Sequence, residues 1–473
     1  MIKQLSGILV VIFTTIFVDI AYSQTLDEAK ELYKKGEYEK AMPAFEKAAK
    51  ATPNNSSYNQ WYGNCLLETG KIAESEKYLK YAASRNIKES FRSLGKLYML
   101  QYKFPEAQKA YEDYLAFLKK EKNQEDMPAI EVLINQAKTA FRLLSHCEDI
   151  QIADSIVVNK IDFLNYYTIL SKESGAIYEL NKAACYENQL KSKRYYSKQG
   201  EDGNYHIYSQ SNLIDGWSDE FKLNLVFEEL DSYNYPFVLS DGITLYFAAT
   251  GEQSIGGYDL FITRYNSGNE SYLKPEQLGM PFNSPYNDYM LAIDEYYGVG
   301  YFATDRFQPE GKVVIYTYLL NNEKRTLETD SEEYRIQRAK IGSIKDSQKE
   351  GVNYSDIQKQ IKAEQQKAIK KESREFEFVI NDNIIYYNLA DFESDAAKQY
   401  FTQYQNLQKQ LRTLGEKLDS NRIKYSKSNA TQKKTMETSI LSDEKRMEDL
   451  VLQIDEIAVK ARNTEINHIK NNQ

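Results

Sequence analysis

Tyr235-Pro-Phe-Val-Leu-Ser-Asp-Gly242 opens a pattern that the chain writes twice, continuing through Leu245-Tyr-Phe-Ala248 and Gly256-Gly-Tyr-Asp-Leu-Phe261. The second copy runs Asp288-Tyr-Met-Leu-Ala-Ile-Asp294, Gly300-Tyr-Phe-Ala303 and Val313-Val-Ile-Tyr316. Tyr246 and Tyr301 are 55 positions apart, and so are Tyr258 and Val313. A repeat of this length is typical of propellers or arrays of short strands joined by tight turns. Because such a unit buries its faces against its neighbours, the repeat favours a binding platform over an active-site pocket.

A second repeat, nearer the N-terminus, is helical. Its first unit carries Ala29, Leu32, Gly36, Tyr38, Ala41, Phe45, Ala48 and Pro53. The same places recur 34 residues on as Gly63, Leu66, Gly70, Ile72, Leu79 and Ala82, and 32 further on as Gly95, Tyr98, Phe104, Ala107 and Tyr111. This spacing resembles the tetratricopeptide repeat, whose small residues let paired helices approach closely. With a capping helix near Ala129–Cys147, we expect residues 24–149 to form a tetratricopeptide domain.

The rest of the chain divides into four parts. Residues 150–321 are expected to form a WD40-like, propeller-type domain, with a mixed connector at 150–172 and a degenerate earlier blade around Tyr195 and Tyr208. Residues 322–375 read as a charged linker that is helical in places, because they are poor in apolar side chains. Residues 376–390 read as a strand pair that could cover a propeller edge. The expected fold class is multidomain α + β: an α-solenoid, a diverged or partial β-propeller and long C-terminal helices.

The C-terminal region, residues 391–473, carries heptad spacing. Two apolar seams are separated by the polar break Ser426–Asn429. The first contains Tyr400, Leu407 and Leu414, and the second contains Met447, Leu450 and Ile454. The pattern predicts two long helices. A hairpin within the chain and a coiled coil between chains are both compatible with it.

The N-terminus predicts export. An apolar run from Ile8 to Ile20 is followed by Ala21-Tyr-Ser23, so residues 1–23 read as a signal peptide with Gln24 as the new N-terminus. An uncleaved anchor is the alternative, but the run is short and contains Asp19. We therefore expect a periplasmic protein, associated with the outer membrane, with no transmembrane span after cleavage.

Bulk properties exclude some partners. The net charge is -9, and the basic residues are interspersed with acidic ones, which argues against nucleic acid. Cys65, Cys147 and Cys185 are far apart in the sequence; two of them could pair in an oxidising compartment, but buried or unpaired thiols are the simpler expectation.

The blade phrases resemble TolB-type propeller blades with WD40-like repeats. The resemblance extends to Bacteroidetes envelope proteins that fuse tetratricopeptide repeats to such blades. It rests on four segments: Pro236–Gly242, Gly256–Phe261, Leu278-Gly-Met-Pro-Phe-Asn-Ser-Pro285 and Gly300-Tyr-Phe-Ala-Thr-Asp-Arg306. Some of those proteins serve type IX secretion and carry a peptidoglycan-binding domain, whereas this chain ends in heptads. The resemblance implies a cell-envelope role with envelope or outer-membrane proteins as partners.

No catalytic or metal constellation stands out. The histidines, His146, His206 and His468, lie in three different regions, and neither a phosphate-binding loop nor a nucleophile elbow is present. The aspartates of the blades, among them Asp241 and Asp259, fit turns and backbone bonding better than calcium binding or catalysis. We therefore expect no enzymatic activity, no cofactor and no metal.

The repeat resemblance implies a peptide groove lined by the first helix of each pair. The matching positions are Lys30, Tyr33, Lys34, Gln60, Asn64, Glu68, Arg92 and Lys96. Four of them are basic in a chain that is acidic overall, which would suit an acidic peptide or a C-terminal carboxylate; an ordinary solvated helix face is the alternative.

The expected function is a non-enzymatic exported scaffold that binds other envelope proteins through this groove and a propeller surface, in an outer-membrane or secretion-related assembly. The alternative is a glycan- or peptidoglycan-binding module, with Tyr233, Tyr235, Tyr286 and Tyr289 as the candidate exposed rings.

Overall fold

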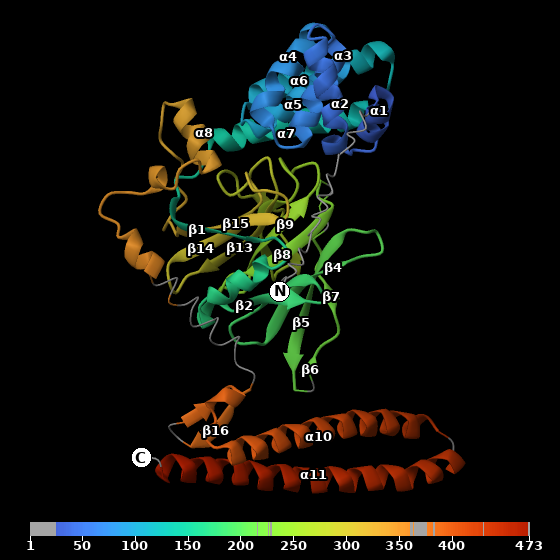
Figure 1. Cartoon of the computed structure of the whole chain (residues 1–473), viewed down its shortest axis with the longest axis vertical. Helices are drawn as coiled ribbons and strands as arrows, with labels where there is room; N and C mark the ends of the chain where they lie inside the picture. The colour runs from blue at the N-terminus through green and yellow to red at the C-terminus, as the bar shows by residue number, and fades with distance from the viewer. Residues whose placement is uncertain are drawn as a thin grey trace, which may run out of the picture. The chain divides into compact units, whose positions relative to one another are not determined.

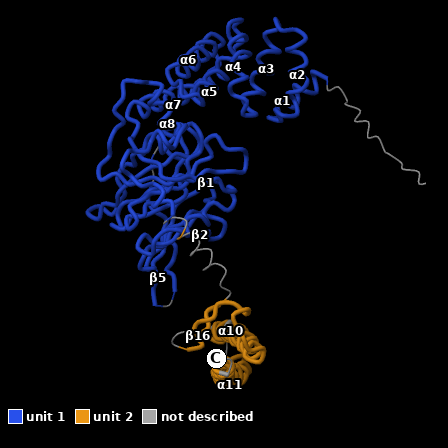
Figure 2. The backbone as a smooth tube through the Cα atoms, turned by 60° about the vertical axis from the view of Figure 1, so that its left-hand side comes forward, with its two compact units in different colours: residues 1–359 blue, residues 360–473 orange. Residues whose placement is uncertain are grey.

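The computed structural model describes residues 25–214, 216–225, 227, 229–359, 363, 376–381, 384–428 and 430–471. The chain divides into two compact units with the boundary between Lys359 and Gln360 (Figure 1 and Figure 2). The order of elements confirms the expected fold class: helical repeats come first, then a strand-rich region, then long helices. The expected signal peptide, residues 1–23, lies outside the described residues, so export stays a prediction.

The first part of unit 1 consists of helices that run back and forth. They are α1 (Leu26–Lys34), α2 (Tyr38–Ala51), α3 (Ser56–Glu68), α4 (Ile72–Ser84), α5 (Lys88–Leu100), α6 (Phe104–Glu121) and α7 (Met127–Ser145). The turns within the pairs need a left-handed residue, which Gly36 and Gly70 supply at φ of 77° and 78°. In the third pair Tyr102 takes that place at φ 66° although it is not a glycine.

Two glycines let paired helices touch. A Cβ on Gly63 would lie 2.9 Å from Leu79 Cγ, and one on Gly95 would lie 2.2 Å from Tyr111 Cε1. These are the small and large landmarks of the repeat, and they meet across the α3/α4 and α5/α6 pairs. The repeat spacing therefore reflects direct packing between the two helices of a pair.

The second part of unit 1 contains three antiparallel sheets. The first sheet holds β2 (Ala176–Leu180), β3 (Ala183–Glu187), β4 (Lys193–Gln199), β5 (Tyr205–Leu213), β6 (Gly216–Trp217) and β7 (Phe221–Lys222). The second holds β8 (Ser232–Val238), β9 (Thr244–Thr250), β10 (Asp259–Asn266), β11 (Ser271–Tyr272) and β12 (Glu276–Gln277). The third holds β1 (Gln151–Asn159), β13 (Asp288–Asp294), β14 (Val299–Thr304) and β15 (Lys312–Leu319).

The two copies of the sequence repeat form equivalent meanders, β8–β9–β10 and β13–β14–β15. Phe247 pairs with Phe261 in the first meander, and Phe302 pairs with Tyr316 in the second. Phe247, Phe261 and Phe302 are fully buried. The alternation of large side chains along these strands therefore marks the face that packs in the core.

The strand β1 corrects the connector expected at 150–172. It is the outermost strand of the third sheet and pairs antiparallel with β15, Ile152 opposite Tyr318. After β1 the chain passes through the short helices η1 (Phe163–Ile169) and η2 (Lys172–Ser174). Tyr167 Oη there donates to the Met290 carbonyl at 3.0 Å, and the Ser171 amide donates to Asp294 at 2.7 Å. The last sheet is thus completed by a strand that precedes the first sheet.

In the segment 322–375, expected as a charged linker that is helical in places, residues as far as 358 pack on the third sheet. This segment contains α8 (Glu332–Lys340) and η3 (Lys345–Ser347), and it lies against the free edge of β1. Ser347 Oγ accepts from the Ile152 amide at 2.9 Å, and Gln358 Nε2 donates to the Ala153 carbonyl at 2.8 Å. Polar side chains thereby satisfy the backbone groups that an edge strand exposes, which explains why so few apolar residues are needed.

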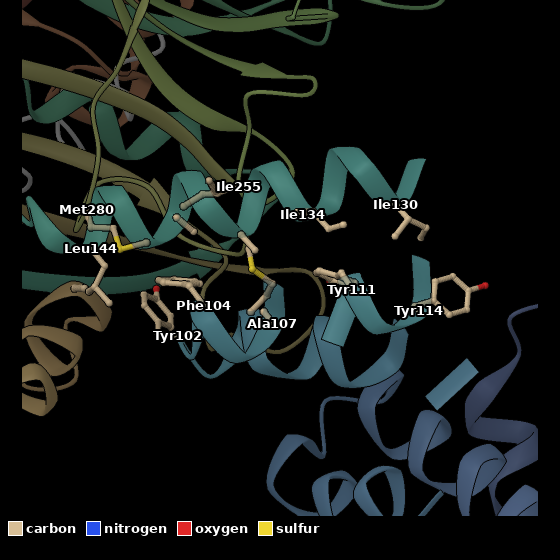
Figure 3. Packing of buried hydrophobic residues seen from close by; sticks show 14 of the residues in the cluster. Tyr102, Phe104, Ala107, Tyr111, Tyr114, Ile130, Ile134, Leu144, Ile255 and Met280 are labelled. Atoms are coloured by element: carbon tan, nitrogen blue, oxygen red, sulfur yellow. The ribbon is translucent and has the colours of Figure 1, made fainter. Parts of the chain in front are cut away.

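The helical repeats and the sheets share one apolar cluster. Tyr102, Phe104 and Tyr111 from the α5–α6 region pack with α7, and the loop residues Ile255 and Met280 join the same cluster (Figure 3). All of them are buried. Because the cluster is continuous, the repeats and the sheets form a single compact unit.

Unit 2 is built on a helical hairpin. It comprises β16 (Phe378–Asn381), β17 (Ile384–Tyr386), η4 (Leu389–Asp391), α10 (Asp395–Lys427) and α11 (Ala430–Asn471). The helices pair along their length, with Lys417 Nζ 2.9 Å from Asp443 Oδ2. The strand pair packs on these helices through Phe378, Tyr386 and Phe401, so its apolar face is buried within unit 2. Its expected role as a cover of a propeller edge stays a prediction.

Candidate functional site: the groove of the helical repeats

A hollow of unit 1 that carries predicted site residues lies on the face of α1, α3 and α5. It is a cavity of about 600 Å³. One wall comes from the first helices of the pairs and a second from α6 and α7. The third comes from the loops after β9 and after β12, through Ile255, Gly256 and Pro285. The loops belong to the same apolar cluster as α6 and α7 (Figure 3). The groove is therefore shaped by the helical repeats and the second sheet together.

The structure brings seven of the eight predicted groove residues to this cavity: Tyr33, Lys34, Gln60, Asn64, Glu68, Arg92 and Lys96. The eighth, Lys30, does not line it. Its Nζ pairs with Asp27 at 2.9 Å and lies 5.3 Å from the centre of the Trp61 ring. Lys30 is therefore placed outside the groove, and its charge is already paired.

The basic side chains of the groove differ in whether they form ion pairs. Lys96 Nζ lies 2.6 Å from Glu68 Oε2, and Lys34 Nζ lies 2.7 Å from Glu31 Oε1. In the part of the chain that the structure describes, the Arg92 guanidinium has neither a hydrogen-bond partner nor an ion-pair partner, and it is exposed at the cavity. Arg92 is thus the cation that is left to meet an anionic ligand.

Arg92 acts electrostatically on three tyrosines of the cavity. Tyr38, Tyr111 and Tyr114 line the same cavity. Burial raises the pKa of Tyr111 and of Tyr114, and the positive charge of Arg92 acts in the opposite direction on both. These phenols are therefore protonated at neutral pH, so each can donate a hydrogen bond to a bound anion.

The amides of the groove are partly engaged. Asn64 is buried, and its Oδ1 accepts from Ser93 Oγ at 2.6 Å. This bond leaves the Asn64 Nδ2 group as a donor at the cavity wall. Gln60 Nε2 donates to Tyr33 Oη at 3.2 Å. The cavity therefore presents donors from several helices, as recognition of a carboxylate requires.

Several lining residues were missed by the sequence analysis. Tyr111 was recognised there only as a core landmark of the third repeat, and Ile255 and Pro285 were assigned to blades. Because Tyr111 occupies a landmark position of the repeat, its place in the lining of the cavity could have been predicted from the sequence. The loops that contain Ile255 and Pro285 could not have been predicted to line it, because their contact with the helices depends on tertiary packing.

The tyrosines considered for a glycan are mostly unavailable. Tyr233 and Tyr289 are buried, at 5% and 2% exposure. Tyr289 Oη donates to Asp305 at 2.5 Å, and Tyr235 packs on Phe163, Tyr258 and Tyr289. The expectation that these rings are exposed is wrong for Tyr233 and Tyr289, since they fill the interior between strands. Tyr286 is half-buried against Phe307.

The blade aspartates and the cysteines have structural surroundings. Asp241 Oδ1 accepts the amides of Ile243 and Thr244, both at 2.9 Å, in the β8–β9 turn. Asp259 Oδ2 accepts the Ile255 amide at 2.9 Å. Cys65, Cys147 and Cys185 are buried and not joined to one another, and burial raises the pKa of the Cys185 thiol to about 11.

Comparison with known proteins adds one family. Residues 32–86 match the tetratricopeptide repeat family model, which covers α2, α3 and α4 and the end of α1. None of the curated proteins compared with the chain matched it. In the described residues, no helix is both long and apolar enough to cross a membrane. Tetratricopeptide repeats suggest a scaffold for protein–protein interactions, and the match extends over residues 32–86 of this chain.

Proposed function

We propose that this chain is an exported, non-enzymatic scaffold of the cell envelope whose repeat groove binds a peptide carrying an acidic group or a free C-terminal carboxylate. The observation that carries the proposal is Arg92, which has no hydrogen-bond or ion-pair partner among the described residues and lines a cavity of about 600 Å³. Protonated tyrosine hydroxyls and the Asn64 amide flank it. A carboxylate would take the place of solvent on these donors.

The helical repeats and the loops of the strand-rich region wall the same groove. This arrangement supports a scaffold whose two binding surfaces adjoin each other. The blade loops form part of the groove, and the strand-rich region partially fits a propeller. A partner segment held in the groove would therefore also meet the second sheet. The envelope location and the propeller surface rest on the resemblance in the sequence and on the predicted signal peptide.

Peptide binding tests the groove. A library of fluorescent peptides that vary in their last residues, each made with a free carboxylate and as the amide, is titrated with the mature chain. The free-carboxylate forms are expected to bind more tightly, and Arg92→Glu is expected to weaken their binding by about 10–100-fold, because a hydrogen bond to a charged group is lost.

Arg85→Glu is the matched control, since Arg85 is exposed and lies 5.6 Å from the Tyr81 ring outside the cavity. It should leave binding unchanged. Equal binding of the acid and amide forms, or equal loss with both variants, would contradict the groove assignment. N-terminal sequencing of protein from fractionated cells tests export separately: intact Met1 in the cytoplasm would remove the envelope role.

A further inference from the structure

The first sheet ends in a group of exposed apolar side chains far from the groove. The β5–β6 hairpin extends away from the helical repeats (Figure 1). Leu213 and Ile214 lie at its end, where Leu213 is 59% exposed and Ile214 is fully exposed. Leu190, in the neighbouring β3–β4 turn, is 77% exposed. We call Leu190, Leu213, Ile214 and Trp217 the apolar tip.

Hydrogen bonds hold the two turns of the apolar tip together. The Asn212 amide donates to the Ser192 carbonyl at 2.8 Å, and Asn212 Nδ2 donates to the Lys191 carbonyl at 3.0 Å. Asn212 also pairs with Trp217 across β5 and β6. The aliphatic side chains therefore belong to one surface rather than being scattered singly, and a clustered apolar surface indicates an interaction site.

The surroundings of the apolar tip are basic. The two turn sequences, residues 188–194 and 211–217, hold Lys191, Lys193 and Arg194 against a single acidic residue, Asp215. The Arg194 guanidinium stacks on the Trp217 ring, 4.2 Å from its centre, and donates to Gln210 Oε1. This contact orients Trp217 beside the turns.

We propose that the apolar tip inserts into the surface of an anionic phospholipid membrane. Aliphatic side chains at a turn end can enter the acyl region, tryptophan prefers the boundary between water and hydrocarbon, and lysine and arginine bind anionic headgroups. A membrane suits this surface better than a protein groove, because the aliphatic groups lie at the end of a narrow hairpin and the neighbouring turn sequence carries Lys191, Lys193 and Arg194. The inference goes beyond the groove and does not depend on it.

Vesicle binding tests the insertion. The mature full chain is mixed with vesicles of phosphatidylethanolamine containing phosphatidylglycerol, and bound protein is measured by sedimentation. Binding is expected to rise with the phosphatidylglycerol fraction and to fall with salt. The double variant Leu213→Ser, Ile214→Ser should bind about 100-fold more weakly, since each aliphatic group contributes roughly tenfold.

Ile161→Ser is the matched control, because Ile161 is 83% exposed and lies in the turn after β1. It should bind as the unaltered chain does. Unaltered binding by the double variant, or no binding of the unaltered chain to phosphatidylglycerol vesicles, would overturn the proposal; the second result would leave the tip to a protein partner.

Tryptophan fluorescence supplies an independent readout. The chain has two tryptophans, Trp61 and Trp217. In Trp61→Phe, Trp217 alone reports, and its emission is expected to shift to the blue on vesicles and to be quenched by brominated lipid. Vesicle binding with unchanged Trp217 emission would place the membrane contact elsewhere and reject the apolar tip.

Discussion

Arg306 Nη2 lies 2.7 Å from Asp288 Oδ1, and both side chains are completely buried. The same guanidinium donates to the carbonyls of Pro281 and Phe282, at 2.7 and 2.9 Å. It also reaches the Ala339 carbonyl at the end of α8, at 3.4 Å. This one cation therefore joins the third sheet, the loop that contacts the helical repeats and the segment that covers β1.

Replacing Arg306 by a neutral residue should lower the stability of unit 1. Arg306→Met is expected to lower the free energy of unfolding by about 3–5 kcal/mol, because Asp288 and the two carbonyls lose their buried partner. Chemical denaturation of unit 1 measures the loss. The double variant Arg306→Met, Asp288→Asn should lose less than the sum of the single variants, since the two residues interact directly. A loss below about 1 kcal/mol for Arg306→Met would contradict this role.

Asp259 should make stability depend on pH. Burial is the main cause that raises its pKa well above the usual value, and the Asp288 charge adds to it. The folded chain then keeps a proton that the unfolded chain loses near pH 4. The stabilisation by this proton is full below that pH and is lost as the pH rises through the folded pKa.

Asp259→Asn tests this dependence, because asparagine keeps the shape and stays neutral. The variant should be more stable than the unaltered chain at pH 8, by on the order of 1.4 kcal/mol for each unit by which the pKa is raised within that range. The gain should shrink toward pH 4. A gain that is the same at both pH values, measured by urea denaturation, would exclude the titration of Asp259 as its source.

Phe261 is expected to be a core residue of the second sheet. It is fully buried and stacks on Phe247, with ring centres 5.8 Å apart. Phe261→Ala should cost on the order of 3–5 kcal/mol as a large-to-small change in a core. Phe221→Ala is the control, since Phe221 is 65% exposed, and it should change stability by less than about 0.5 kcal/mol. Similar losses for both variants would mean that burial is not the cause.

The C-terminal hairpin should close within one chain. Leu414, Leu418, Leu450 and Ile454 are buried between α10 and α11. Glu465 joins the ends by accepting from Tyr386 Oη at 2.8 Å and from the Glu393 amide at 2.7 Å. Light scattering is expected to give a monomer both for the mature chain and for a chain ending at Lys359. A dimer or trimer that dissociates on truncation would make the helices an assembly device.

Much of the fold could be predicted from periodicity. The 34-residue spacing located the helical pairs because Gly63 and Leu79 must meet where two helices touch. The 55-residue offset located the two meanders because Phe247 and Phe302 occupy the same buried place. Tyr233 and Tyr289 are buried although they flank turns, because their burial depends on contacts with neighbouring strands that the local sequence does not specify. Seven groove residues could be placed on one face because the resemblance to the tetratricopeptide repeat assigns them to the first helix of each pair.

Helical pairs, strand meanders and two long helices follow from the amino-acid pattern alone, since they form through contacts a few residues to a few tens of residues apart. The tertiary packing was needed to show that β1 completes the third sheet, that residues 326–358 cover its edge, and that Ile255 and Pro285 wall the groove. Those contacts join segments far apart in the chain. Their partners are selected by shape and by unsatisfied backbone groups, which leave no periodic signal in the sequence.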